Sequence, residues 1–181
     1  GGGVAPDGGH LIGGGCGGVN VGAVRFNENG SPDAGFGTAG AATHVIGDIS
    51  GLTFVDADVL NDGRLVISGH GTTADSANAD VVTVAIGADG IRDESWGPAG
   101  VAAYLGQYAV QVKDAAPAAD GGLWLSGIYL TGGWRLVIVK TTPTGALDSN
   151  VNGGYHLTGR GFDALKSMAA GPKRFIAGSK I

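Results

Sequence analysis

The chain has 181 residues, of which 15% are charged, and carries a net charge of −5 at pH 7. The length is ample for one compact domain with a core, and the scattered Lys and Arg residues exclude the clustered positive charge of a nucleic-acid surface. No apolar run approaches the length of a membrane helix, and the first residues lack the basic and apolar regions of a signal peptide.

Glycine accounts for 37 residues and cysteine for 1. So much Gly without a collagen period, alongside 43% hydrophobic residues, predicts many short strands joined by tight turns. The single Cys16 excludes an internal disulfide and a cysteine-based metal site.

Four short strands each follow a Gly-containing turn and end in a small residue and Gly. Asp-Gly turns suit hairpins because Gly adopts a positive φ without a steric cost. The segments recur about 55 residues apart, which is typical of repeat architectures: DGGHLIGG (Asp7–Gly14), DGRLVISG (Asp62–Gly69), DGGLWLSG (Asp120–Gly127) and a degraded GPKRFIAG (Gly171–Gly178).

An alternating strand follows each of the first three segments and leads into Asn-Gly, Asp-Gly or Thr-Gly. Val21–Gly40 overlays Val81–Gly100 without a gap, and Leu136–Val151 keeps the first half of the pattern. Two more short strands complete each unit; they are expected at Ala41–Ile46, Val101–Leu105 and Tyr155–Leu157, and then at Leu52–Val59, Ala109–Ala115 and Phe162–Met168.

Four antiparallel strands in a unit of about 55 residues are typical of one β-propeller blade. We therefore predict an all-β fold of β-propeller blades, with three four-stranded antiparallel blades and part of a fourth from an incomplete ring. The approximate repeats are 1–50, 51–106, 107–160 and 161–181. A two-sheet sandwich is the rival architecture, and it would not require the period.

The motif VRFNENGSPDAGFGTAG (Val24–Gly40) resembles the delta-60 repeat of bacterial proteins, and ADGIRDESWGPAG (Ala88–Gly100) is similar to it. The third copy departs from the pattern, because Val151 and Asn152 stand where an aromatic residue and Gly are expected. The resemblance implies β-propeller blades over nearly the whole chain, but no shared activity. Together with the low charge it implies a bacterial protein that is secreted or on the cell surface.

Closed propellers have roughly four to eight blades, and an open arc of three would expose a sheet face. We therefore expect the chain to be part of a larger propeller, whose remaining blades are another copy of the chain, another chain or residues removed by proteolysis.

The candidate ligand-binding residues are aromatic rings and imidazoles. His44, Tyr104 and His156 align in the three units and are candidates for one groove that binds a polar ligand or a metal ion; strand ends that are partly exposed are the structural alternative. Trp134 and Tyr129 flank Thr-Gly-Gly and have no counterparts in the other units, which makes them candidates for sugar stacking or for local packing.

Other repeated residues are expected to be structural. The side chains of Asp33, Asp93 and Asp148 follow a turn Gly at a fixed offset and are predicted to cap backbone N–H groups. The equivalent aromatic residues Phe36 and Trp96 are predicted to pack as wedges between blades, and Trp124 aligns with apolar residues of the core.

Two further clusters offer weaker chemistry. The carboxylates of Asp56, Asp58 and Asp62 are oxygens that calcium favours, but no Glu follows at the spacing of an EF-hand. Ser68 stands beside His70 without a third orienting group, at a small position required in every unit.

The sequence thus favours a non-catalytic binding or scaffolding module, without catalytic residues, a metal or a cofactor. Its ligand would be a protein or a glycan, contacted by the variable loops at one end of the blades. A lectin-like propeller, or a propeller hydrolase or lyase with its site at the central channel, is the alternative. An enzyme would require His, Tyr, Arg or acidic groups that converge from several blades.

Overall fold

A computed structural model describes residues 1–18, 20–47, 49–76, 78, 80–130, 133–161, 164–168 and 176–179, with side chains up to residue 157. The expected strand at Gly171–Gly178 lies partly outside these residues, as do Phe162 and Asp163 of the expected strand before it. Within the described residues, no helix is long and apolar enough to span a membrane.

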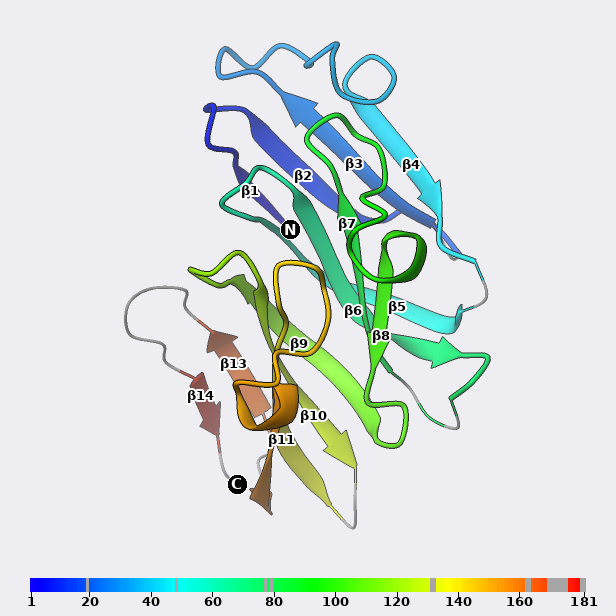
Figure 1. The fold of residues 1–181 in the computed structure, drawn as a ribbon, viewed down its shortest axis with the longest axis vertical. Helices are drawn as coiled ribbons and strands as arrows, with labels where there is room; N and C mark the ends of the chain where they lie inside the picture. Colours follow the sequence, from blue (N-terminus) through cyan, green and yellow to red (C-terminus); the bar gives the residue numbers. More distant parts are fainter. Residues whose placement is uncertain are drawn as a thin grey trace.

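The strands form four antiparallel sheets in chain order (Figure 1). The first sheet contains β1 (Gly2–Val4), β2 (His10–Gly15), β3 (Asn20–Phe26) and β4 (Ala41–Val45), and the second β5 (Ile49–Val59), β6 (Leu65–Thr73), β7 (Asp80–Ile86) and β8 (Val101–Tyr104). The third contains β9 (Ala109–Pro117), β10 (Leu123–Leu130), β11 (Trp134–Lys140) and β12 (Tyr155–Gly161), and the last β13 (Ala164–Met168) and β14 (Ile176–Ser179). The helical segments of the described chain are two 3₁₀ turns, Pro98–Gly100 and Asn152–Gly154, which directly precede β8 and β12.

This arrangement confirms the predicted fold class: three four-stranded antiparallel blades and two strands of a fourth. Neighbouring strands in each sheet are also neighbours in sequence, so each sheet is built from one continuous segment of the chain. The first strands of consecutive sheets contact one another, β1 with β5, β5 with β9 and β9 with β13. The four sheets therefore follow one another as blades.

The blades have two ends with different connections. The Asp-Gly end carries the turns before β2, β6 and β10, in which Gly8, Gly63 and Gly121 have φ values of 85°, 88° and 86°. The opposite end, here called the loop end, carries the β2–β3, β6–β7 and β10–β11 hairpins and the β4–β5 and β8–β9 connections.

Consecutive sheets pack face to face. We call the face turned to the preceding sheet the front face and the face turned to the following sheet the rear face. In β6, Leu65 and Ile67 lie on the front face and Val66 on the rear face, because successive side chains of a strand alternate; all three are fully buried.

Two cores result from this packing. The first joins the rear face of the first sheet to the front face of the second, and it includes Leu11, Val21, Ala23, Leu65, Ile67, Val82, Val84 and Ile86. The second joins the rear face of the second sheet to the front face of the third, and it includes Val66, Val81, Ala85, Leu123, Leu125, Val137 and Val139.

The two predicted wedges are confirmed. Phe36 and Trp96 are both fully buried and belong to the first and the second of these cores. The neighbouring backbones come so close that a Cβ on Gly90 would stand 2.6 Å from the Gly37 nitrogen. Trp124 is only half-buried, since it lies on the rear face of the third sheet, with the Lys140 ammonium 5.8 Å from its ring.

Candidate functional site

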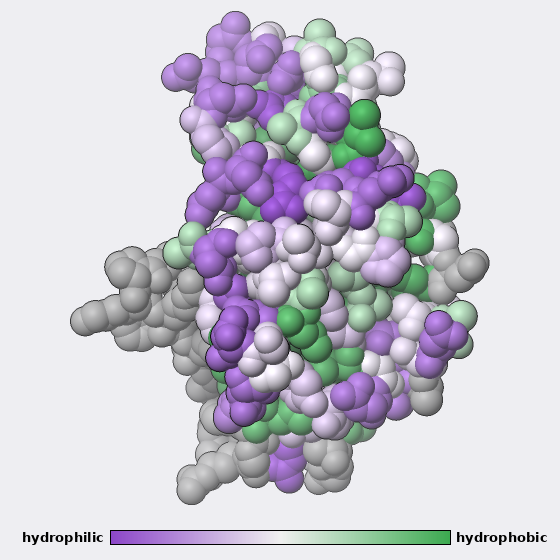
Figure 2. Space-filling model, viewed as in Figure 1, coloured by the Kyte–Doolittle hydropathy of each residue, from purple (hydrophilic) through white to green (hydrophobic). Residues whose placement is uncertain are grey.

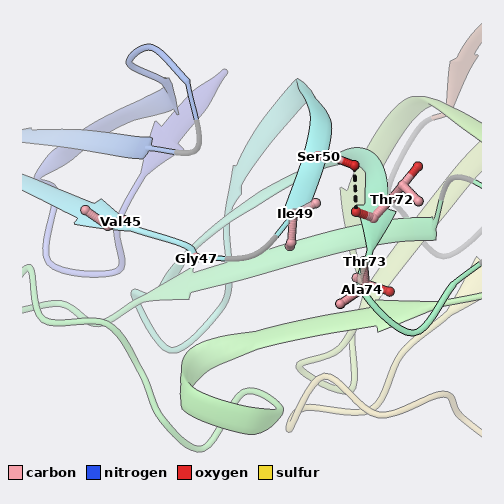
Figure 3. Close-up of a pocket in the computed structure, with 7 residues that line it drawn as sticks. All are labelled: Val45, Gly47, Ile49, Ser50, Thr72, Thr73 and Ala74. Carbon is pink, nitrogen blue, oxygen red and sulfur yellow. Dashed lines mark hydrogen bonds between the residues drawn. The ribbon is translucent and has the colours of Figure 1, made fainter.

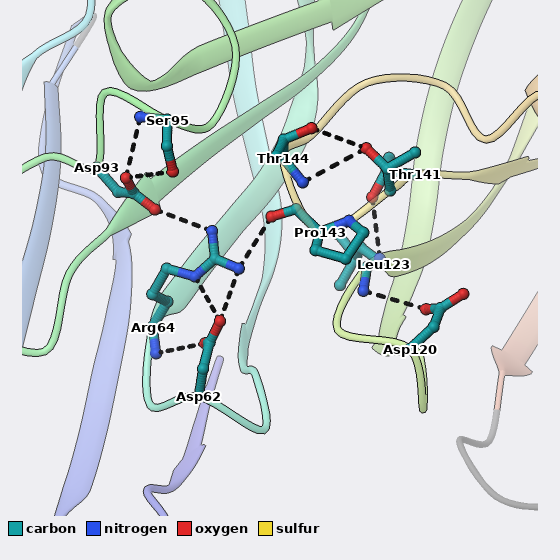
Figure 4. Close-up of polar contacts among 11 residues, drawn as sticks. Asp62, Arg64, Asp93, Ser95, Asp120, Leu123, Thr141, Pro143 and Thr144 are labelled. Atoms are coloured by element: carbon teal, nitrogen blue, oxygen red, sulfur yellow. Dashed lines mark hydrogen bonds and ion pairs between the residues drawn. The ribbon is translucent and has the colours of Figure 1, made fainter.

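A cation lies between two aspartates at the Asp-Gly end of each four-stranded sheet. In the first sheet, Arg25 contacts Asp7, and its Nε lies 2.8 Å from Asp33 Oδ2. In the second, Arg64 lies 2.7 Å from Asp62 Oδ2 and 2.9 Å from Asp93 Oδ2 (Figure 4). In the third, Lys140 Nζ lies 2.8 Å from Asp120 Oδ2 and 3.6 Å from Asp148 Oδ2.

The second aspartate of each cluster also caps the turn, as predicted. The backbone nitrogens of Gly35, Ser95 and Asn150 donate to the Oδ1 atoms of Asp33, Asp93 and Asp148 at 2.9, 3.0 and 3.1 Å. Each of these carboxylates thus uses one oxygen for the turn and the other for the cation. Sequence reasoning found the cap but missed the ion pair.

The cation comes from two different positions. In the first and third sheets it stands on the strand, as Arg25 and Lys140, whereas the second sheet has Ala85 at that position and supplies Arg64 from the Asp-Gly turn. Gly9 and Gly122 hold the position of Arg64. A Cβ on Gly122 would stand 2.9 Å from Lys140 Nζ, so the two positions compete for one space.

These ion pairs change the acidity of the carboxylates. Burial by itself would raise the pKa of Asp62 and Asp93. Hydrogen bonds from Arg64 and backbone groups, and for Asp93 first from the Ser95 hydroxyl, outweigh it and lower both pKa values. Asp120 follows the same pattern beside Lys140. Asp62, Asp93 and Asp120 therefore stay ionised at neutral pH, and their ion pairs act as structural ties.

Moving the cation of the first sheet from the strand to the turn tests whether the two positions share one site. We expect Arg25→Ala to cost about 2 kcal/mol, since it removes the charge between Asp7 and Asp33, and Gly9→Arg to destabilise the chain, because its Cβ would stand 3.1 Å from Arg25 Nη2. The double variant reproduces the second sheet and should recover at least half of the loss. Urea unfolding of all four chains gives the coupling energy; additive losses would contradict the shared site.

His44 and Tyr104 bond to the next sheet instead of lining a common groove. His44 Nε2 lies 2.9 Å from the Gly90 carbonyl oxygen, and the Tyr104 hydroxyl donates to the Gly145 carbonyl oxygen. Gly90 and Gly145 are equivalent turn residues of the second and third sheets, so both rings tie one blade to the next. Burial raises the pKa of Tyr104, which keeps its hydroxyl protonated.

His156 does not share the position of His44 and Tyr104. Strand pairing sets His44 opposite Val21 and Tyr104 opposite Val81, whereas His156 pairs with Ile138. The equivalent residues in the first two sheets are Ala42 and Ala102. The sequence alignment of His156 with the other two rings is therefore wrong by two positions. The structure therefore does not bring the three rings together.

Tyr129 and Trp134 lie on opposite faces of the third sheet. Trp134 pairs with Leu130, and Tyr129 pairs with Arg135, so the two aromatic side chains point away from each other. Tyr129 is 5% exposed and packs edge-on against Tyr108, with ring centroids 5.5 Å apart. Trp134 is 39% exposed and Leu130 52%, which leaves this pair at the surface of the loop end.

Three polar side chains that sequence reasoning did not group together lie on the rear face of the second sheet, which packs on the third sheet. Asp58 Oδ2, Ser68 Oγ and His70 Nδ1 are buried without a hydrogen-bond partner. Burial, with Asp56 and Asp114 nearby, raises the pKa of Asp58 to about 7, and burial also lowers the pKa of His70. In the described part of the chain, no three His, Cys, Asp or Glu side chains are grouped as metal ligands would be.

Asp62 does not join Asp56 and Asp58 in the acidic cluster that the sequence offered as calcium ligands. Its carboxylate is held by Arg64 through two contacts, from Nε at 2.9 Å and from Nη2 at 2.7 Å. The close sequence spacing of the three residues did not predict this, because Asp62 lies beyond the end of β5, in the turn.

A shallow groove lies between the first two sheets at the loop end (Figure 3). Its volume is about 630 Å³, and its lining combines the aliphatic side chains of Val45 and Ile49 with the hydroxyls of Ser50 and Thr72. Figure 3 shows Ser50 Oγ directed at the Thr72 carbonyl oxygen, 3.3 Å away. The space-filling view has hydrophobic atoms at the surface where β4 ends (Figure 2), and Val45 there is 65% exposed.

The buried carboxylate of Asp80 holds the connection between β6 and β7, beside the groove. Asp80 is 3% exposed and accepts hydrogen bonds from the Thr73 nitrogen, the Thr73 hydroxyl and the Ser76 hydroxyl at 3.2, 2.8 and 2.9 Å. These bonds fix one wall of the groove.

Comparison with known families agrees with this architecture. A family described as "Domain of unknown function (DUF5122) beta-propeller" matches residues 9–36, the stretch that contains β2, β3 and the wedge Phe36. No curated protein matches the chain. The sheets and this match together define a protein of the β-propeller class.

Proposed function

We propose that the chain is a non-catalytic binding or scaffolding module within a larger propeller, whose remaining blades come from another copy or another chain. Its ligand is a protein bound at the loop end. The finer assignment to the delta-60 repeat, and with it a bacterial protein that is secreted or on the cell surface, belongs to the same proposal and is supported by the motif at Val24–Gly40.

One observation carries the proposal: the exposed apolar pair Leu130 and Trp134 at the tip of the third sheet. Thr72 and Gly17 stand at the position of Leu130 in the other sheets, so the pair is not a requirement of the repeat. An exposed tryptophan is a typical anchor of a protein interface, and Leu130 beside it extends the apolar surface. The aliphatic groove at Val45 and Ile49, on the same end, suits a peptide segment.

The ionisable groups support binding over catalysis. The cations Arg25, Arg64 and Lys140 are each held between aspartates, and His44 and Tyr104 bond to main-chain carbonyls at two separate sheet junctions. An enzyme at the channel would need such groups to converge on one cavity.

Glycan binding is the second candidate, and the exposed indole of Trp134 favours it. The companion residue proposed for stacking, Tyr129, is packed against Tyr108 on the other face, so a sugar would rest on a single ring. This geometry ranks a protein ligand above a glycan.

Truncation of Trp134 tests the proposal. A displayed library of random peptides and a panel of soluble polysaccharides are used as probes, with the unmodified chain, Trp134→Ala and Ile91→Ala. Ile91 is 65% exposed at the Asp-Gly end and serves as the matched control. We expect selected peptides to lose at least tenfold in affinity for Trp134→Ala, and to bind Ile91→Ala unchanged. Binding of polysaccharides alone would replace the protein ligand by a glycan, and binding that Trp134→Ala leaves intact would refute the site.

A further inference from the structure

The front face of the first sheet is open, whereas the front faces of the second and third sheets are buried. Ile12 is 54% exposed. Its equivalents Ile67 and Leu125 are 0% and 1% exposed, because the rear face of the preceding sheet covers them. Val4, which pairs with His10 on the same face as Ile12, is 60% exposed.

The open face is also hollowed. A cavity of about 450 Å³ is lined by Ile12, Val24 and the small residues Gly14, Gly22 and Ala41. Val82 and Val137 stand at the position of Gly22 in the other two sheets, and both are fully buried. The small residues leave room for side chains of a partner sheet.

Three consecutive carbonyl groups receive hydrogen bonds at the first sheet junction. Arg25 Nη1 donates to the Ala88 oxygen at 3.3 Å, the Gly37 nitrogen to the Asp89 oxygen at 2.8 Å, and the ring of His44 lies 2.9 Å from the Gly90 oxygen. The donors are a cation, a glycine N–H and a ring at the end of the last strand.

The second junction repeats this set of bonds. Arg64 Nη2 donates to the Pro143 oxygen at 2.9 Å, the Gly97 nitrogen to the Thr144 oxygen at 3.1 Å, and the Tyr104 hydroxyl to the Gly145 oxygen (Figure 4 shows the first of these). The two arginines come from different positions of the repeat, and the two rings are a His and a Tyr, yet they reach the same carbonyl positions. The pattern therefore belongs to the repeat and not to one pair of residues.

The first sheet carries the same acceptors without donors opposite them in the described chain. Glu28, Asn29 and Gly30 occupy the positions of residues 88–90 in the gapless overlay, and all three are exposed. Gly30 has a φ of 80°, close to the 83° of Gly90. The turn therefore has the backbone form of the acceptor turns in the other two sheets.

We propose that the front face of the first sheet is a docking surface for a further blade of this same repeat. The blade covers Ile12 and Val24 with its apolar rear face, and its cation, glycine N–H and His or Tyr donate to the carbonyls of Glu28, Asn29 and Gly30. This specifies the blade partner named in the proposed function, and it does not depend on any ligand at the loop end.

A tandem chain provides the test. Residues 49–113 are repeated ahead of Gly1, because Asp114 is the repeat equivalent of Gly1 and the added β5–β8 sheet then meets the first sheet as it meets the third. The probe is Cys16, the only cysteine of the chain. Its Sγ would stand 3.4 Å from a Cβ on Gly22 and lines the hollow of the open face.

We expect an aromatic disulfide reagent to label Cys16 at least tenfold more slowly in the tandem chain than in the original chain. Ile12→Glu in the tandem chain should restore fast labelling, whereas Ile91→Glu at its original position should not. Circular dichroism and urea unfolding of Ile12→Glu in the original chain show that the substitution does not impair folding, since Ile12 is exposed there. Equal labelling rates in the two chains, or equal effects of the two substitutions, would overturn the docking surface. Loss of ligand binding at Trp134 would leave these rates unchanged, so the two proposals fail separately.

Discussion

Replacing Asp58 with Asn is expected to stabilise the chain by about 4 kcal/mol at pH 8, and by little at pH 4. The pKa of Asp58 is raised to about 7 by burial first, and then by the nearby carboxylates of Asp56 and Asp114, while the N-terminal ammonium opposes the shift. Its Oδ2 atom is buried without a hydrogen-bond partner. Asn keeps the shape of the side chain without its charge.

The direction of the effect follows from proton binding. Between about pH 4 and pH 7 the unfolded chain has lost the proton of Asp58, whereas the folded chain retains it. The free energy of unfolding therefore falls as the pH rises through this window, and it carries the full penalty above pH 7. Below pH 4 both states are protonated and the penalty vanishes. Asp62, Asp93 and Asp120 act in the opposite direction, because their pKa values are lowered.

Urea unfolding at pH 4, 6 and 8 measures the effect, and the difference between variant and original chain isolates Asp58 from the other carboxylates. Asp75→Asn, at an exposed position, is the control and should change the free energy of unfolding by less than about 0.5 kcal/mol at each pH. A pH profile of Asp58→Asn parallel to that of the original chain would contradict the assignment.

Replacing Trp96 with Ala is expected to cost between about 3 and 5 kcal/mol. The side chain is fully buried between the second and third sheets. Its Nε1 atom donates to Thr83 Oγ1 at 3.0 Å, and the Arg64 guanidinium lies 5.4 Å from the ring centroid. Truncation would open a cavity, leave Thr83 with one hydrogen bond fewer and remove the surface that supports the cation.

The chain offers its own control in a second tryptophan. Trp134→Ala should cost less than about 1 kcal/mol, because this ring is 39% exposed. Urea unfolding of both variants under the same conditions makes the comparison. Similar losses would mean that Trp134 is a core residue and would remove it from the binding surface, whereas a small loss for Trp96→Ala would contradict the wedge.

Local sequence chemistry was sufficient for most of the strands, although it did not predict β1 (Gly2–Val4). Asp-Gly turns and alternating apolar residues act over a few neighbouring positions, so the turns at Gly8, Gly63 and Gly121 and the strands around them were predictable. The aromatic wedges Phe36 and Trp96 were also predictable, because a fixed offset from a repeated turn places them at one point of every blade. The caps of Asp33, Asp93 and Asp148 follow for the same reason.

The aligned repeats contain a signal from which the ion-pair clusters could have been predicted. Arg25, Ala85 and Lys140 form one column of the repeat, and Gly9, Arg64 and Gly122 form another. A cation missing from the first column is present in the second, which signals one shared space. Only the distances in the folded chain turn this exchange into contacts with two aspartates.

The sequence by itself determined the class of fold, the number of strands in each unit and the residues that terminate them. Tertiary structure alone decided which side chains meet across sheets. It placed His156 two positions from the column of His44 and Tyr104, turned Tyr129 and Trp134 to opposite faces, and buried Asp58 beside other carboxylates. The physical reason is range: turns and alternation are properties of adjacent residues, whereas register, burial and charge environment depend on packing between strands that are distant in the chain.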